Sequence, residues 1–294
     1  MVWLALGVLA LGCGGPPRAE VEGRKFVRCA QRDPPRVASE LVGLSLTLEQ
    51  RVLTVRAPAP PRVVAFAGPA GERIPEVQLA RLRAARPSVI VYLGGLGDEA
   101  ATARHNLTRL ASLDALTLFL PGGSDRAPIV GEAFDALDDA ARDRVLDASG
   151  LRGLVIDEVR YAVVAGAPLG RLARTDDACG FTEEDLAEVR AALAGSRAPV
   201  RLLSWHAPAG QGVSMGLGAS ELGSPELGQL AHAIGARGGI HAYPEARAGR
   251  AASAEGALVV RRLGLTGARR ADGSFAAAGF SVLPTSTGGR PDQP

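Results

Sequence analysis

The sequence has very little lysine, asparagine, histidine and cysteine. Among its 294 residues there are one lysine (Lys25), one asparagine (Asn106), four histidines and three cysteines. The 33 basic residues are balanced by 31 acidic ones, which leaves a formal net charge of +2. Nucleic-acid binding needs a concentration of positive charge, so this balance excludes nucleic acid as a partner. The apolar run at 2–11 is too short for a membrane-spanning helix, which needs about 20 such residues.

Apolar residues are plentiful: they make up 47% of the chain, against 22% charged residues. A chain of this length and composition can bury a substantial core, as one large domain or two small ones. The composition excludes a disordered or collagen-like protein.

The N-terminus resembles the signal sequence of a bacterial lipoprotein. An apolar run at 2–11 is followed by Gly12 and Cys13, the residue that would carry the lipid. No Lys or Arg precedes the run, so the alternatives are a buried N-terminal strand or a misassigned start codon. We expect 1–22 to be a signal peptide and lipid tether. The protein is then exported to the cell envelope, on the periplasmic or outer-membrane face, and contacts the membrane only through the lipid.

In an exported protein, the two remaining cysteines have a further meaning. Disulfides persist outside the cytosol, and Cys29 and Cys179 could pair, although sequence does not show their separation. At the other end, 285–294 is polar and rich in Pro and Gly, and we expect a disordered tail.

The body of the chain alternates apolar runs with amphipathic segments. After two short strands at 44–47 and 51–55, we expect buried strands at 63–67, 89–93, 116–120, 153–156, 161–166 and 200–205. We expect helices at 75–85, 99–112 and 129–148, and two more beginning after the caps Thr182 and Ser224. This alternation predicts an α/β fold. The proline-rich segment at 57–62 predicts a boundary between an N-terminal part, 23–61, and a main domain, 62–284.

Glycine-rich turns follow the strands in a regular order. They read GPAG, GGLGD, PGGSD, SWHAP and GGIHAY, at 68–71, 94–98, 121–125, 204–208 and 238–243. Together they resemble the five motifs of the calcineurin-like metallophosphoesterases, and GGIHAYPEAR is nearest the purple acid phosphatase branch. The resemblance covers about 62–245. It implies a four-layer α/β/β/α sandwich, whereas the strand pattern alone also allows one doubly wound sheet.

The metal ligands that the resemblance implies are largely missing. Such enzymes hold two divalent ions that clamp a phosphate ester and generate a hydroxide nucleophile. The ions need acidic, imidazole or amide groups within bonding distance. Five motif positions lack their usual ligand or catalytic group here: Pro69, Gly95, Gly123, Ser124 and Gly239.

Two histidines remain at motif positions, His206 and His241. Without a bridging carboxylate they could hold at most one ion weakly, and their alternative role is structural. Asp98 and Asp125 also follow strands, and could assist them or cap helices. The other two histidines, at 105 and 232, lie off the apolar faces of the predicted helices, and we expect them at the surface.

Three functions therefore stand side by side. The first is a lipid-tethered, non-catalytic metallophosphoesterase fold without a cofactor, which binds or scaffolds an unknown protein or small-molecule partner. The second is a phosphoric ester hydrolase with an altered site, using one ion or none, around His206, His241, Asp98 and Asp125. The third is a nucleotide-binding module at 94–97, whose glycine spacing departs from G-x-G-x-x-G.

Overall fold

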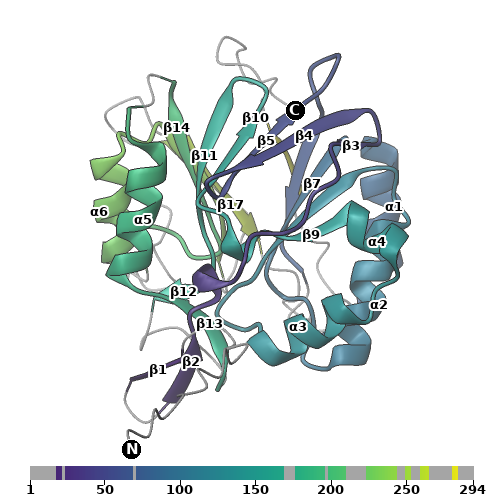
Figure 1. The fold of residues 1–294 in the computed structure, drawn as a ribbon, viewed down its shortest axis with the longest axis horizontal. Helices are drawn as coiled ribbons and strands as arrows, with labels where there is room; N and C mark the ends of the chain where they lie inside the picture. The colour runs from purple at the N-terminus through teal and green to yellow at the C-terminus, as the bar shows by residue number, and fades with distance from the viewer. Residues whose placement is uncertain are drawn as a thin grey trace, which may run out of the picture.

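The fold is described from a computed structural model of the chain (Figure 1). The structure describes residues 18–21, 24–68, 71–168, 176–195, 198–209, 223–243, 249–252, 259–264 and 280–283. Two of the expected features, Cys13 and the tail at 285–294, lie outside these residues.

A five-stranded sheet forms one half of the molecule, in the order β18-β6-β7-β8-β9, with β18 antiparallel to β6 and the other pairs parallel. Its strands are Val63–Phe66 (β6), Val89–Leu93 (β7), Leu116–Leu120 (β8), Val145–Asp147 (β9) and Phe280–Leu283 (β18). Strands β6, β7 and β8 are buried along their whole length. Continuous apolar runs of this kind are typical of parallel strands covered on both faces.

Four helices cover the outer face of this sheet (Figure 1). They are Glu76–Ala85 (α1), Ala100–Ala111 (α2), Ala127–Asp135 (α3) and Asp139–Arg144 (α4). Leu79 and Leu82 of α1 and Leu107 of α2 pack against Phe66 and Tyr92 of the sheet in one buried cluster.

A nine-stranded sheet forms the other half, in the order β16-β17-β15-β14-β11-β10-β5-β4-β3. Its strands are Glu40–Leu41 (β3), Leu44–Glu49 (β4), Val52–Arg56 (β5), Gly153–Ile156 (β10), Val159–Val164 (β11), Val200–Ser204 (β14), Gly238–Tyr243 (β15), Gly249–Ala252 (β16) and Val259–Gly264 (β17). The strands β11, β14, β15 and β17 are mutually parallel.

Two helices, Glu183–Leu193 (α5) and Pro225–Ala233 (α6), pack on the outer face of this sheet. Both begin at the predicted caps. Thr182 forms a capping box with Asp185, and the Ser224 hydroxyl accepts a hydrogen bond from the N–H of Leu227.

A third, four-stranded sheet, β1-β2-β13-β12, lies at one end of the sandwich (Figure 1). It comprises Arg18–Val21 (β1), Arg24–Val27 (β2), Ala167–Pro168 (β12) and Ala178–Phe181 (β13), and short 3-10 turns lie at Cys29–Gln31 (η1) and Ala148–Gly150 (η2).

Alternating side chains of the two large sheets produce the layers. Val63 and Ala65 face Leu53, Leu154 and other residues of the nine-stranded sheet in the central cluster. The intervening Val64 and Phe66 face the helices. The fold is therefore a four-layer α/β/β/α sandwich, as predicted.

The helix predicted at 129–148 is wrong. The chain forms α3 there, then restarts as α4 because the Asp138 side chain caps the N–H of Ala141 at 2.8 Å. After α4 the apolar pair Val145-Leu146 is buried as edge strand β9, paired with β8.

The boundary predicted at residues 61 and 62 does not separate two packing units. Strand β5 pairs in parallel with β10, so the N-terminal strands belong to the nine-stranded sheet. The proline-rich segment instead connects the two sheets of one sandwich. Part of the expected tether is also folded, because Arg18–Val21 pairs with β2 as strand β1.

Within the described residues, no helix combines the length and the apolar character needed to cross a membrane.

Candidate functional site

The predicted site lies where β6, β7, β8 and β14 end. Backbone hydrogen bonds continue beyond the strands, from the Gly68 N–H to the Gly94 oxygen at 3.0 Å and from the Gly94 N–H to the Leu120 oxygen at 2.9 Å. The Tyr92 hydroxyl donates to the Gly95 oxygen at 2.8 Å. The turns after these strands are therefore closed onto one another by direct hydrogen bonds.

Asp125 joins two of these turns. Its Oδ2 accepts from the N–H of Gly122 at 2.7 Å and of Gly95 at 3.1 Å, and its Oδ1 accepts from the N–H of Leu96 at 2.8 Å. The residue is 1% exposed. Burial raises the pKa of Asp125 to about 6, the three N–H groups act against that rise, and repulsion from Asp98 adds to it. The Asp125 side chain therefore connects the turns after β7 and β8 through hydrogen bonds.

The two motif histidines are buried beside the end of β14. The Nδ1 of His241, on β15, lies 2.8 Å from the Oγ of Ser204, and that hydroxyl donates to the His206 oxygen at 2.7 Å. Since the single hydroxyl proton is used there, the His241 Nδ1 carries a hydrogen and donates to Ser204. The Nδ1 of His206 lies 2.9 Å from the Ala207 oxygen. Both Nδ1 atoms are thus within hydrogen-bonding distance of oxygen atoms at the end of β14 and in the turn that follows it.

His241 is held neutral. Burial and, to a smaller extent, repulsion from His206 lower its pKa to about 3, against the opposing hydrogen bonds. Its Nε2 has no hydrogen-bond partner within the described part of the chain.

Two of the positions where the resemblance implies a ligand have no room for a side chain. At Gly95 the backbone has φ +74°, and an ideal Cβ would lie 2.6 Å from the Gly68 oxygen. At Gly239 an ideal Cβ would lie 2.4 Å from the Nε2 of His241. Real Cβ atoms do not approach other atoms so closely, so a ligand side chain at either position would displace its neighbours.

The indole of Trp205 covers the ends of β7 and β8. An ideal Cβ at Gly94 or at Gly122 would lie 2.4 Å or 2.3 Å, respectively, from its Cδ1 and Nε1 atoms. The side chain is 1% exposed, and Nε1 has no hydrogen-bond partner among the described residues. The indole thus occupies the space beside both glycines.

The remaining predicted site residues do not join this group. Asp98 is exposed and lies against Gly71, where an ideal Cβ would be 2.3 Å from its Oδ2. Ser124 is half-buried, Gly123 is buried without a side chain to offer, and Pro69 lies outside the described residues. The four candidates His206, His241, Asp98 and Asp125 therefore do not line one open cleft.

These residues do not fit a pair of metal ions. The Asp125 oxygens are taken by three N–H groups, Gly95 and Gly239 provide no donor, and the ring of Trp205 lies over the strand ends. Throughout the described residues, no group of three or more His, Cys, Asp or Glu side chains is arranged to hold a metal. The bridging carboxylate that two ions require has no counterpart in the described part of this site.

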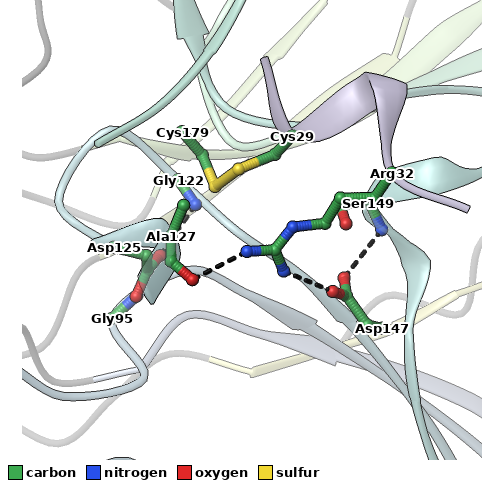
Figure 2. The surroundings of a disulfide bond; sticks show 9 residues. All are labelled: Cys29, Arg32, Gly95, Gly122, Asp125, Ala127, Asp147, Ser149 and Cys179. Carbon is green, nitrogen blue, oxygen red and sulfur yellow. Dashed lines mark hydrogen bonds and ion pairs between the residues drawn. A yellow bond between two sulfur atoms is a disulfide. The ribbon is translucent and has the colours of Figure 1, made fainter. Parts of the chain in front are cut away.

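A disulfide lies beside the turn that follows β8 (Figure 2). Cys29 and Cys179 are bonded, with their Cα atoms 5.3 Å apart. The N–H of Cys179 donates to the backbone carbonyl oxygen of Asp125 at 3.1 Å. Arg32 spans the same region, donating to the Asp147 carboxylate at 2.8 Å and to the Ala127 oxygen at 2.7 Å. The N-terminal segment is thereby fastened beside the strand ends.

A hollow of about 460 Å³ lies away from these residues. It is bordered by the ends of α5 and α6 and the start of β14, with Arg190 and Arg237 among its lining residues. None of the predicted site residues borders it.

Comparison with known proteins places the chain by its fold. No family model matches the sequence, and no curated protein matches it. One crystal structure aligns with a TM-score of 0.54 at 12% identity, covering 69% of this chain and 90% of that one. TT1561 of Thermus thermophilus aligns at 0.48 and 15%, covering 70% and 90%, and purple acid phosphatase PPD1 of yellow lupin (Lupinus luteus) at 0.42 and 11%, covering 80% and 48%. The likeness is one of fold.

The sequence analysis missed two residues of this region, Trp205 and Asn106. Trp205 lies in the SWHAP turn, next to His206. The glycine pairs after β7 and β8 were the sequence signal for it, because a glycine leaves room for a large side chain to pack on the backbone. Asn106, the sole asparagine, is fully buried in α2. It accepts from the Ile74 N–H at 2.9 Å and donates to the Leu96 oxygen at 2.8 Å and the Glu72 oxygen at 3.0 Å, so it supports the β7 turn.

Proposed function

We propose that this chain is a degenerate member of the metallophosphoesterase family, exported and lipid-anchored through Cys13, that binds or scaffolds a partner and does not hydrolyse phosphate esters. The observation that carries the proposal is that Gly95 and Gly239 have neither a metal donor nor room for one. Burial of His206 and His241 supports it, because a substrate phosphate cannot reach fully buried imidazoles.

The catalytic part is tested on the full chain with its disulfide formed. We expect less than one equivalent of Zn, Fe or Mn per chain by elemental analysis after incubation with each metal. We also expect no release of nitrophenol from an aryl phosphate above the buffer rate. Two bound ions per chain together with turnover that a chelator abolishes would refute the proposal.

The anchoring part is tested separately with Cys13→Ser. The chain is produced in a bacterial host and separated between a detergent phase and an aqueous phase. We expect the natural sequence to enter the detergent phase and its Cys13 peptide to carry the added mass of acyl chains. The variant should stay in the aqueous phase. Equal partitioning of both chains, with no added mass, would refute lipidation and leave the catalytic part unaffected.

A second candidate is a hydrolase built on one ion at His206 and His241. It is favoured by the His241 Nε2, whose lone pair has no hydrogen-bond partner within the described residues. Titration with Zn²⁺ decides between the two. Saturable one-to-one binding that is lost in His241→Asn, accompanied by turnover, supports this second candidate, whereas the proposed function predicts neither.

A further inference from the structure

The ring of Trp205 and the carboxylate of Asp125 lie side by side over the strand ends. An ideal Cβ at Gly94 would lie 2.4 Å from two atoms of the indole and 3.1 Å from Asp125 Oδ2, so both groups border the same glycine. Both also border Gly122, through the ring contact and through the 2.7 Å hydrogen bond. The two side chains therefore share the turns that follow β7 and β8.

Their contributions to these turns are complementary. Asp125 holds the backbone N–H groups of Gly95, Leu96 and Gly122, which belong to two different turns. Trp205 comes from the nine-stranded sheet and packs on turns of the five-stranded sheet, so its ring spans the interface between the two. The Asp125 carboxylate therefore connects two turns of the five-stranded sheet, and the Trp205 ring connects these turns to the nine-stranded sheet.

We propose that Trp205 and Asp125 form an internal plug that holds the strand ends together without ions. The ring of Trp205 requires glycine at position 122, and at Gly94 the ring and a backbone φ of +64° both require it. The inference rests on the proposed absence of a metal pair and goes beyond it. It states that side chains of this chain take the place of the metal pair, and that the indole leaves no room for a side chain at Gly94 or Gly122.

The test is a double-mutant cycle between Gly122 and Trp205, measured as the midpoint of thermal unfolding. Gly122 does not have a positive φ, and the three atoms nearest to an ideal Cβ there all belong to the ring of Trp205. We expect Gly122→Ala to lower the midpoint by about 3 °C or more, the effect of overpacking a rigid core. In a Trp205→Leu background the same substitution should change the midpoint by less than about 1 °C, because the colliding ring is gone.

Gly131 gives the matched control, since an ideal Cβ there meets nothing within 4 Å. Gly131→Ala, within α3, should leave the midpoint unchanged or raise it. Equal effects of Gly122→Ala in the two backgrounds would overturn the coupling. Should Trp205→Leu not fold, Trp205→Phe replaces it, and Gly122→Ala behaving like Gly131→Ala in the otherwise natural chain also overturns the proposal.

A metal readout separates this inference from the proposed function. We expect the midpoint to be the same in EDTA and in Zn²⁺ or Mn²⁺, because no ion contributes to the plug. A midpoint that rises by several degrees with metal overturns the plug even when no phosphatase activity is found. Turnover without any metal-dependent rise, in contrast, refutes the proposed function and leaves the plug intact.

Discussion

The Asp125 carboxylate accepts a hydrogen bond from the Gly122 N–H at 2.7 Å, the shortest of the three that it receives. Asp125 and Gly122 lie in the same turn, and the other two donors belong to the turn after β7. A fully buried carboxylate thus brackets two loops using backbone donors alone, with no basic side chain beside it in the described contacts. Burial outweighs these donors and raises the pKa of the carboxyl, so its charge changes in the mildly acidic range.

We predict that Asp125 gives the protein a stability that falls as pH rises from about 4 to about 6. Its pKa is near 3.8 unfolded and about 6 folded, so the folded state binds more protons in this window. The natural chain should lose about 2 kcal/mol of unfolding free energy between pH 4 and 7 relative to Asp125→Asn, which stays neutral. Urea unfolding of both chains at each pH measures the difference. A difference that does not change with pH contradicts the prediction.

His241 should have the opposite effect. Its pKa is near 6.5 in the unfolded chain and about 3 in the folded chain. Its contribution to the unfolding free energy is therefore fully present above pH 6.5 and is lost as the pH falls toward 3, because only the unfolded chain gains the proton. Relative to His241→Asn, whose amide can still donate to Ser204, the natural chain should lose about 3 kcal/mol between pH 7 and 4. The same urea series measures it, and parallel curves for the two chains would show that burial does not suppress the imidazole charge.

Removal of the disulfide should destabilise the fold strongly. The bond joins residues 150 positions apart in sequence, so it restricts the unfolded chain over a long loop. We expect Cys29→Ser with Cys179→Ser to lose about 3 to 5 kcal/mol of unfolding free energy. Denaturant unfolding measures the loss, and the natural chain unfolded under reducing conditions should match the double variant. Cys13→Ser is the control and should unfold like the natural chain.

Asn106→Ala should cost about 3 kcal/mol of unfolding free energy. The substitution leaves the Ile74 N–H and the Leu96 oxygen without their buried partner. Thr108→Ala, on the exposed face of the same helix, provides the control and should change stability by less than about 0.5 kcal/mol. Chemical denaturation compares the two, and a loss of similar size in both would contradict the prediction, since alanine raises helix propensity at either position.

Local chemistry accounts for the elements that the sequence predicted well. Apolar runs such as 89–93 and 116–120 became buried parallel strands, because continuous hydrophobicity is what a doubly covered strand needs. Thr182 and Ser224 began α5 and α6 as expected, since capping depends on residues within one turn.

Non-local pairing accounts for the elements that the sequence predicted poorly. The run ending at Leu146 has helical spacing, and only the free edge of β8 makes it a strand. The pairing of β5 with β10 brings together segments about 100 positions apart, which no local pattern reveals. At the site, the missing ligands could be counted from the motifs, but the Trp205 ring over Gly94 and Gly122 depends on how two sheets meet.

The pairing of β5 with β10 also determines the order in which the sandwich can be assembled. These neighbouring strands are interrupted in the chain by everything from β6 to β9, so four strands of the five-stranded sheet leave the ribosome before β5 meets its partner. Strand β18 joins that sheet last of all, from the far end of the sequence. During synthesis the hairpin of β4 and β5 therefore has one unpaired edge until β10 is made. In an arrested nascent chain that ends before β10, this edge should be accessible to a chaperone.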